Sequence, residues 1–319
     1  MTALADFTPV AVQFIPEPLV TWLDLRGVPF TAPFFRDTVT GAGPERARAL
    51  SGLDELRALD DRPTPAPALF IFHVSRCGST LLSQMLGTLP DHIVVSEAPV
   101  LNDILVAQRP SVERDELLRL VIRALGRNRG SEARRLIVKF SSWNVLAAAA
   151  LHRLFPETPM VWLQRAPQQV LASLAEQPAG WAGWRDSGAP ALELFGLTAA
   201  EAQAMTAAHF RARTVETLFR AAHDARLPFQ IVDYTELPDA LWEKIAPHAR
   251  LSFSNSEVER MRARARFDAK TAGDGFDRHF VPRDRTPALS AEERRYIAER
   301  IAPLYRALGG QETEPVELT

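Results

Sequence analysis

The residues best suited to chemistry lie in one short turn, Ser75-Arg76-Cys77-Gly78-Ser79-Thr80. An apolar run at residues 69–74 precedes it, and residues 79–86 follow with apolar positions spaced as on one face of a helix. A strand that turns at glycine and opens a helix exposes backbone N–H groups at the positive end of the helix dipole. The turn therefore predicts an anion site, although an ordinary strand-to-helix connection can carry the same residues.

This turn departs from the mononucleotide-binding pattern G-x-x-x-x-G-K-[ST]. Gly78 and Thr80 fit the pattern, but His73 stands at its first glycine and Ser79 at its lysine. That lysine would hold the outer phosphates of a triphosphate. A cation returns earlier as Arg76, so the turn indicates a phosphate cradle that is not built for ATP with magnesium.

A second candidate anion site follows another apolar run, residues 160–164. Arg165 comes directly after that run, Pro167 suits the first turn of a helix, and Ser173 lies eight residues after Arg165. A guanidinium and a hydroxyl can bind one phosphate together. The alternative for Arg165 is a solvated or ion-paired side chain.

The elements that must position these residues alternate along the chain. Strands are predicted at residues 69–74, 92–96, 136–140, 160–164 and 229–234, and helices at 79–86, 100–108, 112–127, 143–155, 167–176, 199–225, 239–248, 255–267 and 291–308. This alternation predicts an α/β fold with a parallel central sheet flanked by helices, whose ligands bind at the carboxyl ends of the strands. Residues 177–196 and 268–287 are predicted to be irregular.

The first 65 residues are predicted to form an N-terminal extension to a main domain of residues 66–319. Proline and aromatic residues in 1–43 favour short strands and turns, whereas 45–59 has a helical pattern. We expect the extension to be a flap, a lid on the acceptor side or a subunit contact.

Composition narrows the function classes. A chain of 319 residues with 46% hydrophobic content can bury a sizeable core, and its formal net charge of -2 argues against duplex nucleic acid as the main partner. The single cysteine, Cys77, excludes an intramolecular disulfide and favours a reducing compartment. No stretch reaches the ~18 apolar residues of a membrane span, so we expect a cytoplasmic protein whose oligomeric state the sequence leaves open.

The turn, read as S-R-C-G-S-T-L-L, resembles the 5′-phosphosulfate loop of sulfotransferases, commonly written [KR]-S-G-[ST]-T. Arg165-x-Pro167, with Ser173 eight residues after the arginine, resembles the 3′-phosphate motif of the same family. The resemblance covers residues 68–290 and implies the P-loop type of sulfotransferase fold. It also implies a co-substrate, 3′-phosphoadenosine 5′-phosphosulfate, whose sulfuryl group passes to a hydroxyl or amine acceptor on a small molecule or peptide without a metal.

The resemblance assigns residues to both ends of this donor. They are Arg76, Cys77, Gly78, Ser79 and Thr80 for the 5′-phosphosulfate, Arg165 and Ser173 for the 3′-phosphate, and Lys270 for a late K-x-G loop over the nucleotide. The family usually has serine where Cys77 stands, and we interpret this cysteine as a small packing residue rather than a redox group. The alternative for Lys270 is a surface loop.

The resemblance also suggests a general base, which a hydroxyl acceptor needs as the new bond forms. Many cytosolic members use a histidine on the third strand, but residues 137–142 contain none. Glu97 resembles the catalytic glutamate of the tyrosylprotein and trehalose types; the alternative is a capping or surface residue. Lys139 and Arg76 would stabilise charge on the sulfonate and on the leaving oxygen.

Other stretches are interpreted as structural or remain open. Residues 232–237 resemble a V-x-Y-E-D-L stretch of the family that we take as structural, and His73 is interpreted as a packed strand residue. Trp181, Trp184 and Phe195 suggest an apolar wall, which a lipid, polyketide, peptide or sugar acceptor could contact. The alternatives to transfer of a sulfuryl group are a P-loop nucleotide kinase or other phosphotransferase, and a nucleotide-binding protein without catalysis.

Overall fold

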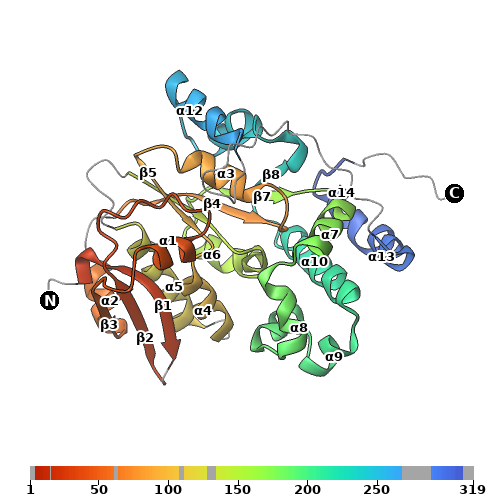
Figure 1. Cartoon of the computed structure of the whole chain (residues 1–319), viewed down its shortest axis with the longest axis horizontal. Coiled ribbons are helices and arrows are strands. Elements are labelled where there is room, and N and C mark those ends of the chain that lie inside the picture. The colour runs from red at the N-terminus through yellow and green to blue at the C-terminus, as the bar shows by residue number, and fades with distance from the viewer. Residues whose placement is uncertain are drawn as a thin grey trace.

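The computed structural model describes residues 4–14, 16–60, 64–107, 111–127, 134–267 and 289–311. At its centre lies a five-stranded sheet in the order β5-β6-β4-β7-β8 (Figure 1). The strands are β4 (Pro67–His73), β5 (His92–Ser96), β6 (Arg135–Lys139), β7 (Met160–Gln164) and β8 (Phe229–Asp233). Each neighbouring pair is parallel, which confirms the predicted fold class.

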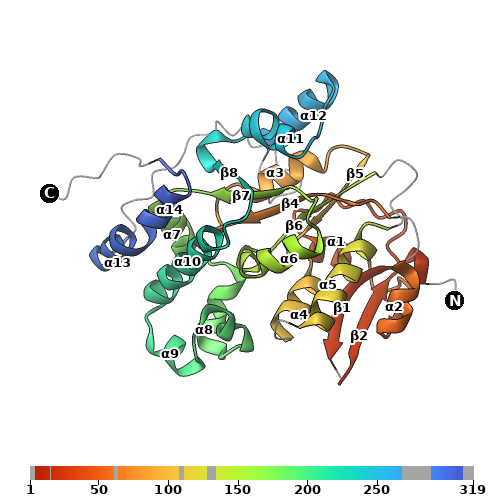
Figure 2. The ribbon, with the colours of Figure 1, turned by 180° about the vertical axis from the view of Figure 1, so that it is seen from behind.

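Helices cover both faces of this sheet, as expected for strands buried on both sides. Helix α3 (Ser79–Leu86), with α12 (Asn255–Ala265) above it, lies on one face, and α5 (Val112–Leu125), α6 (Ala148–Leu154) and α10 (Ala207–Asp224) lie on the other (Figures 1 and 2). The other helical elements in the described part of residues 66–319 are α4 (Pro99–Ala107), η2 (Ser142–Ala147), α7 (Pro167–Glu176), η3 (Gly180–Gly183), α8 (Trp184–Ser187), η4 (Pro190–Phe195), α9 (Ala199–Ala204), η5 (Tyr234–Glu236), η6 (Leu241–Ile245), α11 (Ala246–His248), α13 (Ala291–Tyr296), η8 (Ile297–Ile301) and α14 (Ala302–Ala307). Within the described ranges, no helix is both long and apolar enough to cross a membrane.

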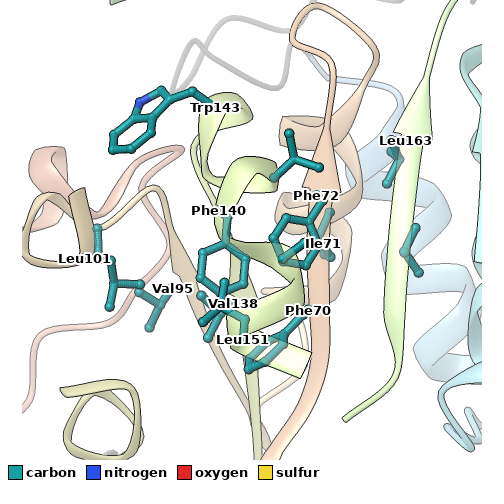
Figure 3. Close-up of a cluster of buried hydrophobic side chains, with 14 of the residues drawn as sticks. Phe70, Ile71, Phe72, Val95, Leu101, Val138, Phe140, Trp143, Leu151 and Leu163 are labelled. Atoms are coloured by element: carbon teal, nitrogen blue, oxygen red, sulfur yellow. The ribbon is translucent and has the colours of Figure 1, made fainter. Parts of the chain in front are cut away.

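Aromatic packing fixes the centre of the sheet. Phe72 of β4 stacks on Phe140, which follows β6, with ring centroids 4.7 Å apart, and Phe70 meets the same ring edge-on (Figure 3). Each buried phenylalanine contributes about 2 to 3 kcal/mol by leaving water. This packing sets the carboxyl ends of β4 and β6 side by side, where His73 and Lys139 lie.

The N-terminal residues form a second, antiparallel sheet. It contains β1 (Thr8–Phe14), β2 (Pro18–Leu23) and β3 (Arg48–Ser51), with η1 (Leu4–Asp6), α1 (Phe35–Gly41) and α2 (Leu53–Asp60) around it. The Val12 N–H of β1 donates to Asp103 of α4, and Asp60 at the end of α2 pairs with Arg119 and Arg123 of α5. The extension is therefore bound to the main domain by polar contacts between regular elements.

Two predicted helices differ from the structure. The first half of the predicted helix at 45–59 is wrong, because Arg48–Ser51 pairs with β2 as an edge strand. The predicted helix at 199–225 is interrupted: Met205 is extended, and the Thr206 hydroxyl accepts the N–H of His209 to begin α10 afresh. Local hydrogen bonds decide both cases, since a capping hydroxyl or an open strand edge outweighs weak helix propensity.

Candidate functional site

The turn after β4 has a backbone that favours glycine at its tightest point. Ser75, Arg76 and Gly78 all have positive φ angles, of 77°, 54° and 84°. A Cβ on Gly78 would also lie 2.7 Å from Cδ1 of Leu237 and 3.0 Å from Cδ2 of Tyr234. Gly78 is the N-cap of α3 and brings no side chain to the first amides of that helix. These amides lie at the positive helix end, as an anion site requires.

His73 fastens this turn to the sheet. Its Nδ1 accepts the Ser75 N–H at 3.0 Å, so the proton is on Nε2, which donates to the Phe140 carbonyl at 3.0 Å. Burial lowers the pKa of His73, which keeps the ring neutral. It is packed in the strand, as predicted, and it also holds the turn in place.

Cys77 is directed into the protein. Its thiol is buried and lies 3.4 Å from the Leu163 carbonyl of β7, to which it donates. Burial raises the pKa of Cys77 to about 12, so the thiolate is absent at neutral pH. The side chain packs, and only the backbone of Cys77 faces the turn.

Glu97 and Lys139 meet at the carboxyl ends of β5 and β6. Strand register places Ser96 opposite Lys139, and the Glu97 N–H donates to the Lys139 carbonyl at 2.7 Å. The Lys139 ammonium lies 2.8 Å from Oε1 of Glu97 and 3.3 Å from the Thr80 hydroxyl of α3. Lys139 is fully buried, whereas 27% of the Glu97 side chain is exposed. The structure therefore brings three predicted site residues together, and of the ion pair only the Glu97 side chain has part of its surface in solvent.

The electrostatics of this cluster favour a charged Glu97. Burial opposes the carboxylate, but the Lys139 ammonium and the nearby His73 outweigh it and lower the pKa of Glu97 to about 2. Glu97 also has a positive φ of 53°, a conformation that costs a non-glycine residue free energy. A strained, charged residue at a strand end is typical of a functional site rather than of a surface cap.

The two predicted anion motifs adjoin, although they are 89 residues apart in the sequence. Arg165, which is 7% exposed, donates from Nη1 to the Arg76 carbonyl at 3.1 Å. In the other direction, Nε of Arg76 donates to the Ser173 hydroxyl at 2.8 Å, and its Nη2 donates to Gln177 at 2.5 Å. The resemblance predicts Arg76 at the leaving phosphate oxygen, whereas its described hydrogen bonds join it to Ser173 and Gln177.

Tyr234 is a site residue that sequence reasoning missed. Its ring lies 4.1 Å from the Arg165 guanidinium and borders Gly78, so it contacts both motifs. The sequence favours a structural role for residues 232–237, whereas Tyr234 contacts both motifs. An aromatic residue directly after a strand at the ligand-binding edge was the available signal.

Two predictions for residues 177–196 need correction. The segment is not irregular, because it forms η3, α8 and η4, and most of its aromatic surface is not free for an acceptor. Trp181 and Phe195 are only 3% and 2% exposed, because Trp181 packs on Phe210 and Phe195 stacks on Trp184. Both side chains are buried against other residues of the protein, so neither can form the apolar wall for an acceptor that the sequence suggests. Trp184 keeps part of its surface in solvent.

Two further observations bound the site. Lys270 and the predicted irregular segment 268–287 lie outside the described residues.

A pocket of about 900 Å³ runs along β8 and α14, but no predicted site residue lines it. Two acidic groups in that pocket already have partners, since Glu236 pairs with Lys244 and Asp233 accepts from Tyr305. We therefore place the candidate site at the turn.

Comparisons with known proteins give distant structural similarity. No family model matches the chain, and no curated protein matches it. Among solved structures, the chain is similar to sulfotransferase STF9 from Mycobacterium avium, with a TM-score of 0.45 and 14% identity over 78% of this chain and 79% of that one. It is similar to a sulfotransferase from Alicyclobacillus acidocaldarius, with a TM-score of 0.44 and 15% identity over 77% and 97%. A sulfotransferase domain of the curacin biosynthetic pathway matches with a TM-score of 0.41 and 14% identity over 80% and 95%.

Proposed function

We propose that this protein is a sulfotransferase that moves the sulfuryl group of 3′-phosphoadenosine 5′-phosphosulfate to a hydroxyl or amine acceptor, with Glu97 as general base and no metal. One observation carries the proposal. The Arg165 and Ser173 motif contacts the Gly78 turn directly, so a doubly phosphorylated nucleotide could reach both anion sites at once. A nucleotide with a single phosphate group would leave one of them unused.

Donor binding divides between the two motifs. The amides of the turn and of the first turn of α3, with the Ser79 and Thr80 hydroxyls, would hold the 5′-phosphosulfate. Arg165 and Ser173 would hold the 3′-phosphate through charge-assisted hydrogen bonds. Arg76, which bonds Ser173, would join the two ends. Tyr234 stacks on Arg165 and keeps its guanidinium in place.

Transfer would proceed at Glu97. The acceptor oxygen or nitrogen gives its proton to the Glu97 carboxylate and forms a bond to sulfur, while the bond from sulfur to the 5′-phosphate oxygen breaks. Adenosine 3′,5′-bisphosphate leaves with the electron pair. Lys139 and the Thr80 hydroxyl, already 3.3 Å apart, are positioned to stabilise negative charge on the sulfonate oxygens.

The ion pair between Lys139 and Glu97 would make the basicity of Glu97 depend on whether donor is bound. Without donor, Lys139 keeps the pKa of Glu97 low, and a carboxylate of such low pKa is a weak base. A bound sulfonate offers Lys139 a second anion, which weakens its hold on Glu97 and raises the pKa of the carboxyl group. The base is then strongest when donor is present.

Isothermal titration calorimetry tests the donor assignment. Adenosine 3′,5′-bisphosphate should bind without magnesium and at least about 10-fold more tightly than adenosine 5′-monophosphate, since the second phosphate gains charged hydrogen bonds. Ser173→Ala should remove most of this difference, whereas Ser187→Ala, an exposed serine of α8, should keep it. Equal affinity for the two nucleotides would overturn the proposal.

Two outcomes would favour the alternatives. Tight binding of ATP that requires magnesium would indicate a phosphotransferase, which Ser79 in place of lysine disfavours. Binding of the bisphosphate without consumption of any acceptor would indicate a nucleotide-binding protein that does not catalyse transfer. The cytoplasmic location also stays a prediction, based on the single cysteine and on the lack of a long apolar run in the sequence.

A further inference from the structure

One aromatic residue of the N-terminal extension lies at the proposed transfer site. The ring of Phe34 packs over the Lys139 ammonium, 4.9 Å from ring centroid to Nζ. The same ammonium pairs with Glu97 at 2.8 Å, so the ring and the proposed base share one partner. In Figures 1 and 2, α1, which begins directly after Phe34, lies between the N-terminal sheet and the central sheet.

The backbone around Phe34 is held firmly. The Thr31 carbonyl accepts Nε2 of Gln84 on α3 at 3.1 Å, and the Phe34 carbonyl accepts the N–H of Asp37 as α1 begins. The next residue, Phe35, is 2% exposed and meets Phe30 edge-on at 5.3 Å. The position of the ring is therefore set by its neighbours, and truncating it need not release the segment.

The Phe34 ring is only half-buried, although an apolar ring next to a buried ammonium could have been covered completely. Ala32 and Pro33 before it are also partly exposed. The Glu97 side chain of the same cluster is also partly exposed. An acceptor atom that reaches Glu97 would thus pass close to an apolar surface made by residues 32–34.

We propose that Phe34 positions the acceptor, and that the acceptor carries its hydroxyl on an apolar or aromatic skeleton rather than on a sugar. The inference rests on the proposed function. An aromatic ring offers an apolar skeleton a favourable contact that expels water. It offers no hydrogen-bond partner to the neighbouring hydroxyls of a polyol, which would lose water without compensation. The N-terminal extension then lines the acceptor side, and of the roles expected from the sequence this one corresponds to the acceptor-side lid.

The test measures acceptor binding without turnover. Calorimetry is performed on the protein saturated with adenosine 3′,5′-bisphosphate, with 2-naphthol and 1-octanol as apolar probes and trehalose as the polyol. At least one apolar probe should bind, with trehalose more than about 10-fold weaker. Phe34→Ala should weaken the apolar probe about 10-fold, as expected for one lost aromatic contact. Leu50→Ala, which truncates an exposed apolar side chain on β3 of the same extension, should bind like the parent.

Kinetics separate positioning from folding. With labelled donor, Phe34→Ala should raise KM for the apolar acceptor about 10-fold and leave kcat within about 3-fold, since the ring touches the acceptor and not the sulfur. Affinity for the bisphosphate should not change. Tighter binding of trehalose than of both apolar probes, or unchanged apolar binding in Phe34→Ala, would overturn this inference. Failure of the bisphosphate to bind the parent would instead overturn the proposed function.

Discussion

Removing the Lys139 ammonium should leave a buried negative charge that the protein can tolerate only by protonating it. In Lys139→Met, Glu97 keeps its place at the end of β5 but loses the cation 2.8 Å away. Breaking a buried ion pair by removing one partner costs about 3 to 5 kcal/mol. At pH 7.5 we expect the melting temperature to fall by roughly 5 to 10 °C.

The loss of stability in Lys139→Met should increase with pH. In the parent, the folded pKa of Glu97 lies below its unfolded value, so the stabilising contribution is complete above about pH 4.5 and is lost only as the pH falls towards 2. In Lys139→Met, burial loses its strongest opponent, and we expect the folded pKa of Glu97 to rise above the unfolded value. The penalty should then be small at low pH and grow as the pH rises through that folded pKa.

Thermal melts from pH 4.5 to 8 would measure the difference between variant and parent. The double variant Lys139→Met/Glu97→Gln removes the charge and should recover most of the lost stability at pH 7.5, with little pH dependence. His73 cannot easily replace the cation, because protonation would cost Nδ1 its hydrogen bond from Ser75. A Lys139→Met penalty that does not change with pH, or a double variant less stable than Lys139→Met, would refute the reasoning.

Two smaller predictions test the turn. Gly78→Ala should lower the free energy of unfolding, measured in urea, by about 2 to 3 kcal/mol and should abolish bisphosphate binding, because a positive φ is combined with crowding against Leu237. Gly196→Ala, where φ is 66° and the added Cβ meets open space, should lower it by only about 1 kcal/mol. Equal losses in the two variants would contradict the crowding at Gly78. The buried Cys77 thiol should not react with a disulfide reagent at pH 8 in the native protein, but it should react once urea unfolds the protein. Rapid labelling of the native protein would show that the thiol is exposed. Cys77→Ser should retain bisphosphate binding.

The central sheet could be predicted because its strands are short apolar runs, almost wholly buried in β4 to β7 and partly buried in β8. Residues 92–96 and 160–164 have the predicted bounds in the structure, and so do α3 and α7. Glycine and serine after one strand, and arginine and proline after another, marked the ends of the strands where ligands bind. Glu97 and Lys139 were each expected at a strand end, but their ion pair is visible only in the structure.

What could not be predicted depends on contacts between distant segments. The edge strand Arg48–Ser51 has a helical pattern and becomes a strand only because β2 offers its free edge. Phe34 reaches Lys139 across the fold, and Tyr234 reaches Arg165 in the same way, so no local spacing indicates either contact. Trp181 and Phe195 looked available for ligands in the sequence because their burial depends on Phe210 and Trp184.

The most direct test of the account is transfer of label from ³⁵S-labelled 3′-phosphoadenosine 5′-phosphosulfate to 2-naphthol, 1-octanol and the small molecules of a cell extract. The parent should label at least one acceptor, and Glu97→Gln should bind adenosine 3′,5′-bisphosphate as the parent does while kcat falls at least about 100-fold. Glu113→Gln, an exposed glutamate of α5, should transfer like the parent. A Glu97→Gln variant that turns over within about 3-fold of the parent, or a parent that labels no acceptor, would contradict the assignment of Glu97 as the base of a sulfuryl transfer.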